Sequence, residues 1–510
     1  MKQTPCVLAF DLGASSGRAL IGEIVMDESG GPSQLRITEV HRFPNNAIQI
    51  GNHLHWDTPL LLQEIKNGIL KAFQAGFEPE SCAIDTWGVD FGLLDRNGEL
   101  LGIPYHYRDH QTEGLVEEVS AFIGAERLFR ESGLQFMPFN TLYQLYAMKK
   151  AGSPKLDLAE TLLLTPDLFN YFLTGRKACE FSMATTTQLY DPGVGEWNTS
   201  LMEELGLPTS MFLEPVQPGT VIGELTDALC SELGVAKMKV IAVASHDTES
   251  AAAAVPASTS SYAYLVSGTW SLLGTAMTSP ILDPAAMEYQ FSNEGGADGT
   301  YHLLKNIMGL WIVQECKRKW EQQGTRHSFG DLVDLAEAAA PFHCLIDPDN
   351  LGFMNPDDMP EAIRSYCRET GQHVPLTVGE IIRCILESLA LRYRQVLEQA
   401  EELTGSLFEG LHMVGGGIQN ELLCRFTANA LGRPVWTGPV EASAIGNMLV
   451  QLETCGHIGD LQDGIELVKS SFPINTYAPE SQQEWSEAYA RYMQIVKTPV
   501  QSKVNANNGK

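Results

Sequence analysis

The sequence predicts an α/β protein with two related domains, because strand-like and helix-like segments alternate and two parts of the chain open in the same way. Residues 6–10 form a continuous apolar run typical of a buried strand, and a turn rich in Gly and Ser leads into a second apolar run at residues 18–25. Residues 262–266 repeat this arrangement, with residues 267–271 as the turn. A chain of 510 residues can hold at least two hydrophobic cores.

The boundary between the domains is expected near a third buried-strand pattern, residues 240–244, which an Ala-rich stretch follows. We therefore predict one domain at residues 1–252 and a second at residues 253–490. The tail, residues 497–510, is polar and has no apolar periodicity, so it is predicted to be disordered.

The second half gives the clearest helix pattern. Thr377 and Glu380 have the spacing of a capping box, and apolar residues follow at helical spacing until Gly405. A strand pattern at residues 410–414 then ends in three glycines, and a helix pattern covers residues 422–431. This alternation supports the α/β prediction.

The charge and cysteine content exclude several classes of function. The formal net charge of −29 repels nucleic acids and anionic membranes, so neither is expected as a partner. No apolar stretch reaches the roughly 20 residues of a membrane span, and the first apolar run is too short for a signal peptide. The ten cysteines include no CxxC pair, which predicts buried thiols in a cytoplasmic protein.

Residues 11–18, DLGASSGR, form the first candidate site. Its small residues allow backbone N–H groups to converge on a phosphate, while Asp11 can hold a metal-bound water. A plain glycine-rich hairpin is one alternative. The residues also fit the G-x-S-x-G pattern of hydrolases with Ser15 as nucleophile, but that pattern requires a helix after the turn, where this sequence predicts a strand.

Asp247 is the candidate general base, because it follows a buried strand and lies between two phosphate-type turns. The alternative is an Asp that caps the next helix. The turn that contains Ser267, Gly268 and Thr269 is a second candidate phosphate site, and residues 415–417, all glycine, would let an adenosine lie against bare backbone. A Walker A loop and a strand-linked GxGxxG are both missing from the sequence.

Two further segments have competing interpretations. His53, His55 and Asp57 could be read as metal ligands, but alternation along a strand gives the same pattern without an ion. Residues 85–91 and 136–144 mix apolar side chains with hydrogen-bonding groups, as a sugar site requires, although core packing would also explain them.

The order of these motifs resembles the FGGY family of carbohydrate kinases. The matching segments cover about residues 7–490 and are DTWGVDF (85–91), YRD (107–109), FNTLYQ (139–144), ATTTQL (184–189), ASHDT (244–248), SGTWS (267–271), NEGG (293–296), LKNIMGLW (304–311) and VGGG (414–417). The resemblance implies two related domains of the actin and hexokinase (ribonuclease H-like) fold with a catalytic cleft between them. It assigns the sugar to the first domain and ATP to the second.

Site residues follow from the same resemblance. The ATP-binding residues that it implies are Ala14, Ser15, Ser16, Gly17, Arg18, Thr269, Gln314 and Gly416. The sugar-binding residues that it implies are Gly88, His246, Asp247, Thr248 and Asn306. Asp247 would be the general base, and Asp11 would act on Mg²⁺ through water.

The reaction that the resemblance implies is ATP-dependent phosphorylation of L-rhamnulose at its C1 hydroxyl, in the breakdown of L-rhamnose. Two departures concern the sugar side: His246 stands where most members of the family have Gly, and residues 143–146, YQLY, replace a Lys-x-x-Trp element. Another ketose, such as L-fuculose or xylulose, therefore stays an alternative, as does a non-catalytic ATP-binding protein. The expected partners are small molecules only, with the oligomeric state left open.

Overall fold

The structure is a computed structural model that describes residues 4–26, 32–258 and 261–497. The chain divides into two compact units, each of which is discontinuous in sequence. Unit 1 comprises Met1–Pro256, Ala276–Leu304 and Glu441–Pro473. Unit 2 comprises Ala257–Thr275, Lys305–Val440 and Ile474–Lys510.

Two expectations from the sequence stay predictions. The first is the division into one domain at residues 1–252 and a second at residues 253–490. The expected disordered tail lies, apart from Lys497, outside the described residues. None of the helices in the described part of the chain combines the length and the apolar character that a transmembrane span requires.

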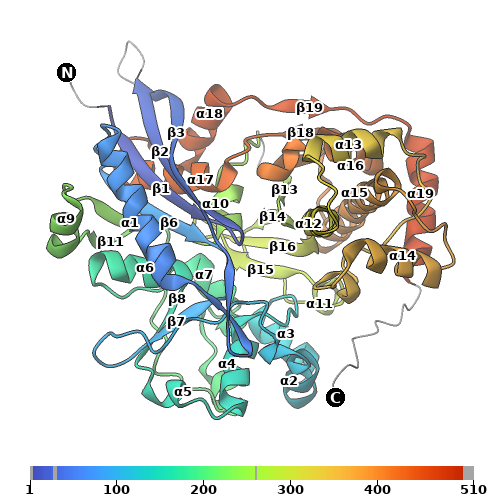
Figure 1. Cartoon of the computed structure of the whole chain (residues 1–510). Helices are drawn as coiled ribbons and strands as arrows, with labels where there is room; N and C mark the ends of the chain where they lie inside the picture. The colour runs from blue at the N-terminus through green and yellow to red at the C-terminus, as the bar shows by residue number, and fades with distance from the viewer. Residues whose placement is uncertain (1–3, 27–31, 259–260, 498–510) are drawn as a thin grey trace. The chain divides into compact units, whose positions relative to one another are not determined.

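Unit 1 is built on a six-stranded sheet with the order β11-β12-β6-β1-β2-β3. β1 pairs with β2 in the antiparallel sense and with β6 in the parallel sense, and β12 continues the parallel part (Figure 1). The strands are β1 (Cys6–Leu12), β2 (Ser16–Met26), β3 (Pro32–Pro44), β6 (Ser81–Thr86), β11 (Thr220–Glu224) and β12 (Lys239–Ala242). The strands predicted at residues 6–10, 18–25 and 240–244 are therefore confirmed.

Helices cover both faces of this sheet, which explains why its central strands are apolar on both sides. Leu8, Phe10 and Leu12 of β1 pack with α1 (Thr58–Gln74) and α6 (Thr165–Thr174) on one face. On the other face, Ala83 and Ile241 pack with Val450 of α17 (Ala442–Thr454). Helix α17 also lies against α10 (Asp247–Ala253), the helix that begins with Asp247.

The rest of unit 1 includes a second core formed by short helices and hairpins inserted after β6. These elements are β7 (Phe91–Leu94), α2 (Leu115–Ile123), α3 (Ala125–Ser132), α4 (Thr141–Lys150), α5 (Pro154–Leu158), β8 (Thr161–Leu164), α7 (Phe181–Thr185), β9 (Tyr190–Asp191), β10 (Glu196–Trp197) and α8 (Thr199–Glu204). The remaining elements are β4 (Ala47–Ile50), β5 (His53–Trp56), η1 (His110–Thr112), α9 (Asp227–Leu233), α11 (Pro284–Glu288), β15 (Ser292–Gly295) and α18 (Leu461–Ser471).

A second sheet has seven strands in the order β15-β16-β14-β13-β17-β18-β19. Its strands besides β15 are β13 (Ala263–Ser267), β14 (Trp270–Met277), β16 (Tyr301–Met308), β17 (Leu411–Val414), β18 (Val435–Thr437) and β19 (Asn475–Tyr477). β13 pairs with β14 antiparallel and with β17 parallel, as β1 does with β2 and β6. Both sheets thus contain a hairpin whose first strand pairs in parallel with a later strand, which confirms the repeat predicted from residues 6–25 and 262–274.

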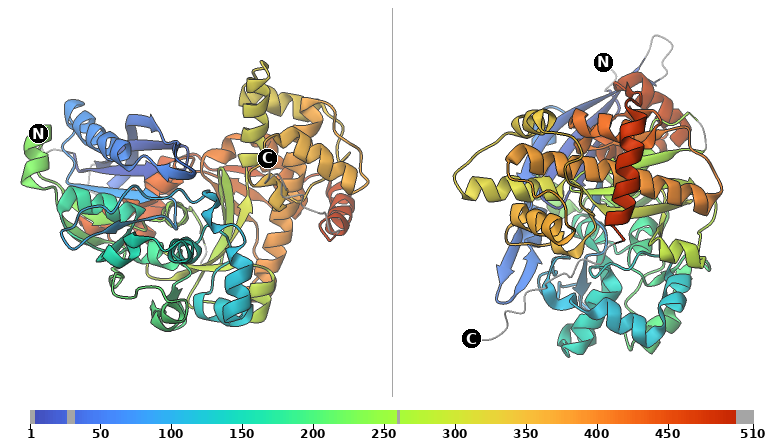
Figure 2. Two further views of the ribbon diagram at one scale, coloured as in Figure 1. Left: turned by 60° about the horizontal axis from the view of Figure 1, so that its bottom comes forward. Right: turned by 90° about the vertical axis from the view of Figure 1, so that its right-hand side faces the viewer.

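The helices of unit 2 include α15 (Val378–Thr404), which had the clearest helix pattern in the sequence. Helix α15 begins with the capping box of Thr377 and Glu380 and ends at Gly405, as predicted. It lies beside α16 (Glu421–Leu431) and α19 (Gln482–Ile495), as the views in Figures 1 and 2 show. The other helices are α12 (Trp311–Gln322), α13 (Phe329–Ala338), η2 (Leu351–Phe353), α14 (Met359–Glu369) and η3 (Gly416–Gln419).

Candidate active site

The parallel strands of unit 1 bring three aspartates to one edge of the sheet. Asp11 of β1 lies opposite Asp85 of β6 in the strand register. His246, just after β12, forms a bridge with Thr86, so Asp247 follows at the same edge. Parallel strands end at one edge of a sheet, where α/β proteins commonly bind their ligands. Asp11, Asp85 and Asp247 are far apart in the sequence but lie together because each is at the end of one of these neighbouring strands.

Arg18 is the cation that faces these carboxylates. It lies opposite Asp11 in the antiparallel pairing of β1 and β2. Its guanidinium forms ion pairs with both Asp11 and Glu441, the residue that precedes α17. No sequence pattern associates Glu441 with Arg18, since 423 positions separate them.

The turn between β1 and β2 is tight and fixed by hydrogen bonds. The Gly13 N–H donates to the Ser16 carbonyl (2.9 Å), and Asn45 donates to the carbonyls of Gly13 (2.8 Å) and Ser15 (3.1 Å). A Cβ atom on Gly17 would lie 2.3 Å from the Phe43 ring, so only glycine fits there. The chain continues as a strand after this turn, which contradicts the strand-turn-helix that a nucleophilic Ser15 requires.

Asp85 is fully buried beside the other aspartates. Burial is the main cause that raises the pKa of Asp85 well above its usual value, and the charges of Asp11 and Asp247 add to it. Asn447 of α17 donates a hydrogen bond of 2.7 Å to its Oδ2 atom. Its Oδ1 atom is buried without a hydrogen-bond partner among the described residues. An oxygen in this state is a candidate ligand for a cation.

Asp247 is the first residue of α10 and is 29% exposed. Its Oδ1 atom lies 3.7 Å from Nε2 of His246, whose Nδ1 atom lies 2.9 Å from Oε2 of the buried Glu294. Burial raises the pKa of Asp247 to about 6, and the charge of His246 opposes that rise. His246 takes the N-cap position, so the interpretation of Asp247 as a helix cap is wrong.

The charge on His246 comes from its carboxylate neighbours. Burial lowers the pKa of the imidazole, but the negative charges of Glu294, Asp247 and Glu249 together outweigh burial and raise the pKa to about 9. Glu249 also lies 2.5 Å from Nδ1 of His302, another buried histidine. At neutral pH, His246 is therefore an imidazolium between two carboxylates.

Glu180 fixes the backbone that carries this pair. Its carboxylate accepts hydrogen bonds from the Ser182 hydroxyl (2.5 Å) and the Ser245 N–H (3.2 Å). The Ser182 hydroxyl oxygen in turn accepts from the His246 N–H (3.1 Å), while the Thr86 N–H donates to the Ser245 carbonyl (2.8 Å). Glu180 was not predicted as a site residue, because an isolated Glu in a loop gives no motif.

The segment that contains Gly88 is held by a buried carboxylate. Asp90 accepts hydrogen bonds from the indoles of Trp56 (2.6 Å) and Trp87 (2.9 Å) and from Gln144 (2.8 Å). The two indoles are stacked with centroids 3.9 Å apart. A Cβ atom on Gly88 would lie 3.0 Å from Thr186, which explains why a glycine stands there. Part of the predicted sugar segment is thus structural core.

In unit 2, β13 and β17 end side by side, and the predicted ATP-binding residues Thr269 and Gly416 follow these two strands. Thr269 follows β13, and its hydroxyl lies 3.4 Å from Oε1 of Gln314 in α12. A Cβ atom on Gly417 would lie 2.2 Å from the Ser267 hydroxyl, whereas one on Gly416 would meet nothing within 4 Å. Gly416 therefore borders open space.

Asn306 lies in β16 of the same unit. Unit 1 therefore holds Asp11, Arg18, His246 and Asp247, whereas unit 2 holds Thr269, Gln314 and Gly416.

The metal interpretation of His53, His55 and Asp57 is not supported by their surroundings. His53 contacts Asp109 (Nδ1 to Oδ1, 3.0 Å), and His55 lies 3.1 Å from the Ile103 carbonyl. Asp57 caps α1 by accepting from the Leu60 N–H. Each side chain has a different local partner, as alternation along β5 predicts.

Family models match both parts of the chain. The model described as "FGGY family of carbohydrate kinases, N-terminal domain" matches residues 6–254, and the corresponding C-terminal model matches residues 263–454. A rhamnulokinase of Bacteroides thetaiotaomicron is 42% identical over 497 residues, which cover 98% of this chain and 100% of that protein. A rhamnulokinase of Oceanobacillus iheyensis is also 42% identical, over 93% of this chain and 98% of that protein.

Solved structures agree on the fold. A ligand-bound xylulose kinase of Lactobacillus acidophilus has a TM-score of 0.79 at 17% identity and covers 97% of this chain, with 98% of its own chain matched. A Plasmodium falciparum glycerol kinase with ADP has a TM-score of 0.74 at 13% identity over 98% of this chain and 99% of its own. The predicted fold class, that of the sugar kinases related to actin and hexokinase, is confirmed. The chain belongs to the FGGY family of carbohydrate kinases.

Proposed function

We propose that this chain transfers the γ-phosphoryl group of ATP to the C1 hydroxyl of L-rhamnulose, giving L-rhamnulose 1-phosphate and ADP. The observation that carries the reaction is Asp247, a partly exposed carboxylate whose pKa of about 6 suits a general base at neutral pH. The substrate is inferred from the names of full-length relatives at 42% identity.

In the proposed mechanism, Asp247 accepts the proton of the C1 hydroxyl as the new O–P bond forms and the bond between the γ-phosphorus and ADP breaks. Phosphoryl transfer needs mainly positioning of the reactants and stabilisation of charge, so an aligned base and fixed cations would provide most of the catalysis. His246 is an imidazolium beside Asp247 and would keep Asp247 in the carboxylate form that accepts the proton. Gly88, Thr248 and Asn306 are the other residues that we assign to the sugar.

For ATP we assign the turn Ala14, Ser15, Ser16 and Gly17, together with Arg18, Thr269, Gln314 and Gly416. Arg18 supports this assignment because it is a cation held at the sheet edge in a chain whose net charge is −29. Its guanidinium can exchange a carboxylate partner for a phosphate of similar geometry. The open space above Gly416 supports a nucleotide lying against the backbone there.

The residues of unit 1 also fit Mg²⁺, the ion expected to accompany ATP. Carboxylate oxygens are its usual protein ligands, and Asp85 offers an oxygen, Oδ1, that lacks a partner among the described residues. Asp11, at the same edge, would hold the ion through water, as the resemblance implies. When bound, the ion would neutralise charge on the phosphates.

We also propose that the reaction takes place in the cytoplasm. All ten cysteines are free, which fits a reducing compartment. On this proposal, residues 1–252 carry the sugar side and residues 253–490 the ATP side.

The test is ADP release with magnesium ATP and, in separate assays, L-rhamnulose, L-fuculose, L-ribulose, D-xylulose and glycerol. Release with L-rhamnulose that disappears in Asp247→Asn supports the reaction and the substrate. Release with a different sugar alone would keep the kinase and contradict the substrate. Silence with every sugar, in protein that still binds ATP, would favour a non-catalytic ATP-binding protein.

A further inference from the structure

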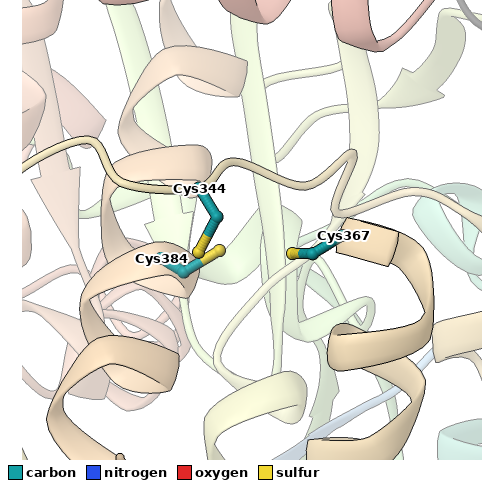
Figure 3. Close-up of side chains that lie close together, drawn as sticks. All are labelled: Cys344, Cys367 and Cys384. Carbon is teal, nitrogen blue, oxygen red and sulfur yellow. The ribbon is translucent and has the colours of Figure 1, made fainter. Parts of the chain in front are cut away.

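Three cysteines meet in the interior of unit 2, outside the residues assigned to sugar and ATP. Their sulfur atoms all lie within 4.8 Å of one another, and each residue is at most 2% exposed. They come from three separate segments: Cys344 follows α13, Cys367 lies in α14 and Cys384 lies in α15. Figure 3 shows Cys367 pointing from the end of α14 toward the other two. Spacing along the sequence gives no sign of this cluster.

Hydrogen bonds fix the segment that carries Cys344. On one side, the Phe342 N–H donates to Oε2 of Glu387 in α15 (2.9 Å). On the other side, the Leu345 N–H donates to Oε1 of Gln372 (2.9 Å), and Gln372 returns a bond to the Leu345 carbonyl (2.8 Å). The Gln372 N–H donates to the Cys367 carbonyl (2.8 Å). The backbone positions of Cys344 and Cys367 are therefore tied to each other and to α15.

We propose that Cys344, Cys367 and Cys384 form a buried three-sulfur site for a soft, thiophilic metal ion of the Cu(I) or Zn(II) class. Thiolate ligands select these ions over Mg²⁺ or Ca²⁺. A metal about 2.3 Å from each of three sulfurs sets the sulfurs about 4.0 Å apart, so the observed separations need little adjustment. Three sulfurs alone satisfy Cu(I), whereas Zn(II) prefers four ligands and would add a water.

Binding at this site needs no oxidant or reductant. It forms three metal–sulfur bonds, and each thiol that binds the ion releases its proton to solvent, with no change in oxidation state.

The full-length chain would be purified without oxygen, stripped with a chelator and given Cu(I) alone or Zn(II) alone. After desalting, metal is measured per chain, and Cu(I)–thiolate absorption is recorded in the near ultraviolet. We expect about one ion per wild-type chain, since buried structural sites hold their ion through desalting. Retention of Cu(I) but not Zn(II) would identify a three-coordinate site. Retention of both ions would identify a site at which a water completes the coordination of Zn(II).

Three single variants, Cys344→Ala, Cys367→Ala and Cys384→Ala, should each lose retention. Cys316→Ala is the matched control, because Cys316 is an equally buried cysteine outside the cluster. If one cluster variant fails to fold, the other two and the wild-type metal content still decide the question. His373→Ala tests the exposed group of His343, His373 and Glu380, the other set of potential ligands in this region.

Three results would overturn the proposal. The first is a wild-type chain that retains neither ion. The second is retention that survives in the cluster variants or disappears in His373→Ala, which would place the ion at the exposed group. The third is a disulfide between two of the three cysteines in the anaerobically purified protein, found as two missing thiols by mass spectrometry, because it would remove the ligands.

Discussion

Nδ1 of His246 lies 2.9 Å from the carboxylate of Glu294, and both side chains are buried. The other ring nitrogen faces Asp247 at 3.7 Å, so Glu294 acts on Asp247 through His246. Burial disfavours the imidazolium, but Glu294, together with Asp247 and Glu249, more than compensates for burial, so the pKa of His246 rises to about 9. We therefore regard Glu294 as a positioning residue.

The first prediction concerns Glu294→Gln. Without the carboxylate, burial dominates and the pKa of His246 falls, so the imidazolium is lost at a lower pH. Ion pairs and hydrogen bonds to charged groups contribute roughly 1.5–3 kcal/mol, which corresponds to a decrease in kcat/KM on the order of 10- to 100-fold at pH 8. The measurement is kcat/KM for the sugar between pH 5 and about 10.

Glu288→Gln is the control for this variant, because Glu288 is an exposed glutamate in the same region of the chain. It should leave the profile unchanged. A uniform loss of activity in Glu294→Gln, with the alkaline limb in its wild-type position, would show that Glu294 has a merely structural role.

The second prediction is the shape of the wild-type pH profile. Asp247 must be deprotonated to accept a proton, and its pKa is raised to about 6, so activity should fall as the pH decreases through 6. His246 must remain protonated, so activity should fall again as the pH increases through about 9. The result is a bell-shaped dependence of kcat/KM on pH. A flat profile from pH 6 to 5 would exclude Asp247 as the base.

The third prediction tests Asp247 directly. Asp247→Asn removes the base but keeps the size of the side chain, so turnover should decrease by on the order of 10² to 10⁴ while ATP still binds. Single-turnover rates and equilibrium ATP binding measure the two effects separately. Asp157→Asn, at an exposed position, is the matched control. Unchanged turnover in Asp247→Asn would remove this residue from the mechanism.

The fourth prediction concerns Arg18→Met. Arg18 is paired with Asp11 and Glu441, and we expect ATP phosphates to compete for it. Losing this cation should raise KM for ATP by about 10- to 100-fold, the size expected for a charged hydrogen bond to phosphate, with a smaller effect on KM for the sugar. Arg36→Met, an exposed arginine on β3, serves as the control. Equal increases in both KM values would argue against a specific role at ATP.

Local signals were sufficient to predict strands β1, β2, β12, β13 and β17 and helix α15 from the sequence. The apolar run of residues 6–10 and the capping box at Thr377 depend on neighbouring residues only, and both match the structure. The partners of the site could not be predicted in this way. Glu441 and Glu180 reach Arg18 and Ser245 only through tertiary packing, and single glutamates far along the chain give no pattern. The cluster of three cysteines was missed for the same reason.

The last prediction links packing to the site through Gly446 in α17. A Cβ atom there would lie 1.7 Å from the backbone oxygen of Ser250 in α10, so α10 and the Asp247 at its start would have to move. Gly446→Ala should lower the free energy of unfolding by about 1–3 kcal/mol and should also reduce turnover. Gly330→Ala, at the exposed start of α13, is the opposite case: its Cβ would meet no close neighbour, so the free energy of unfolding should not decrease. Thermal denaturation of both variants is the measurement. A loss of stability in Gly446→Ala alone would show that the close packing of α17 on α10 is the cause, whereas a loss in both would point to a general effect of replacing Gly by Ala.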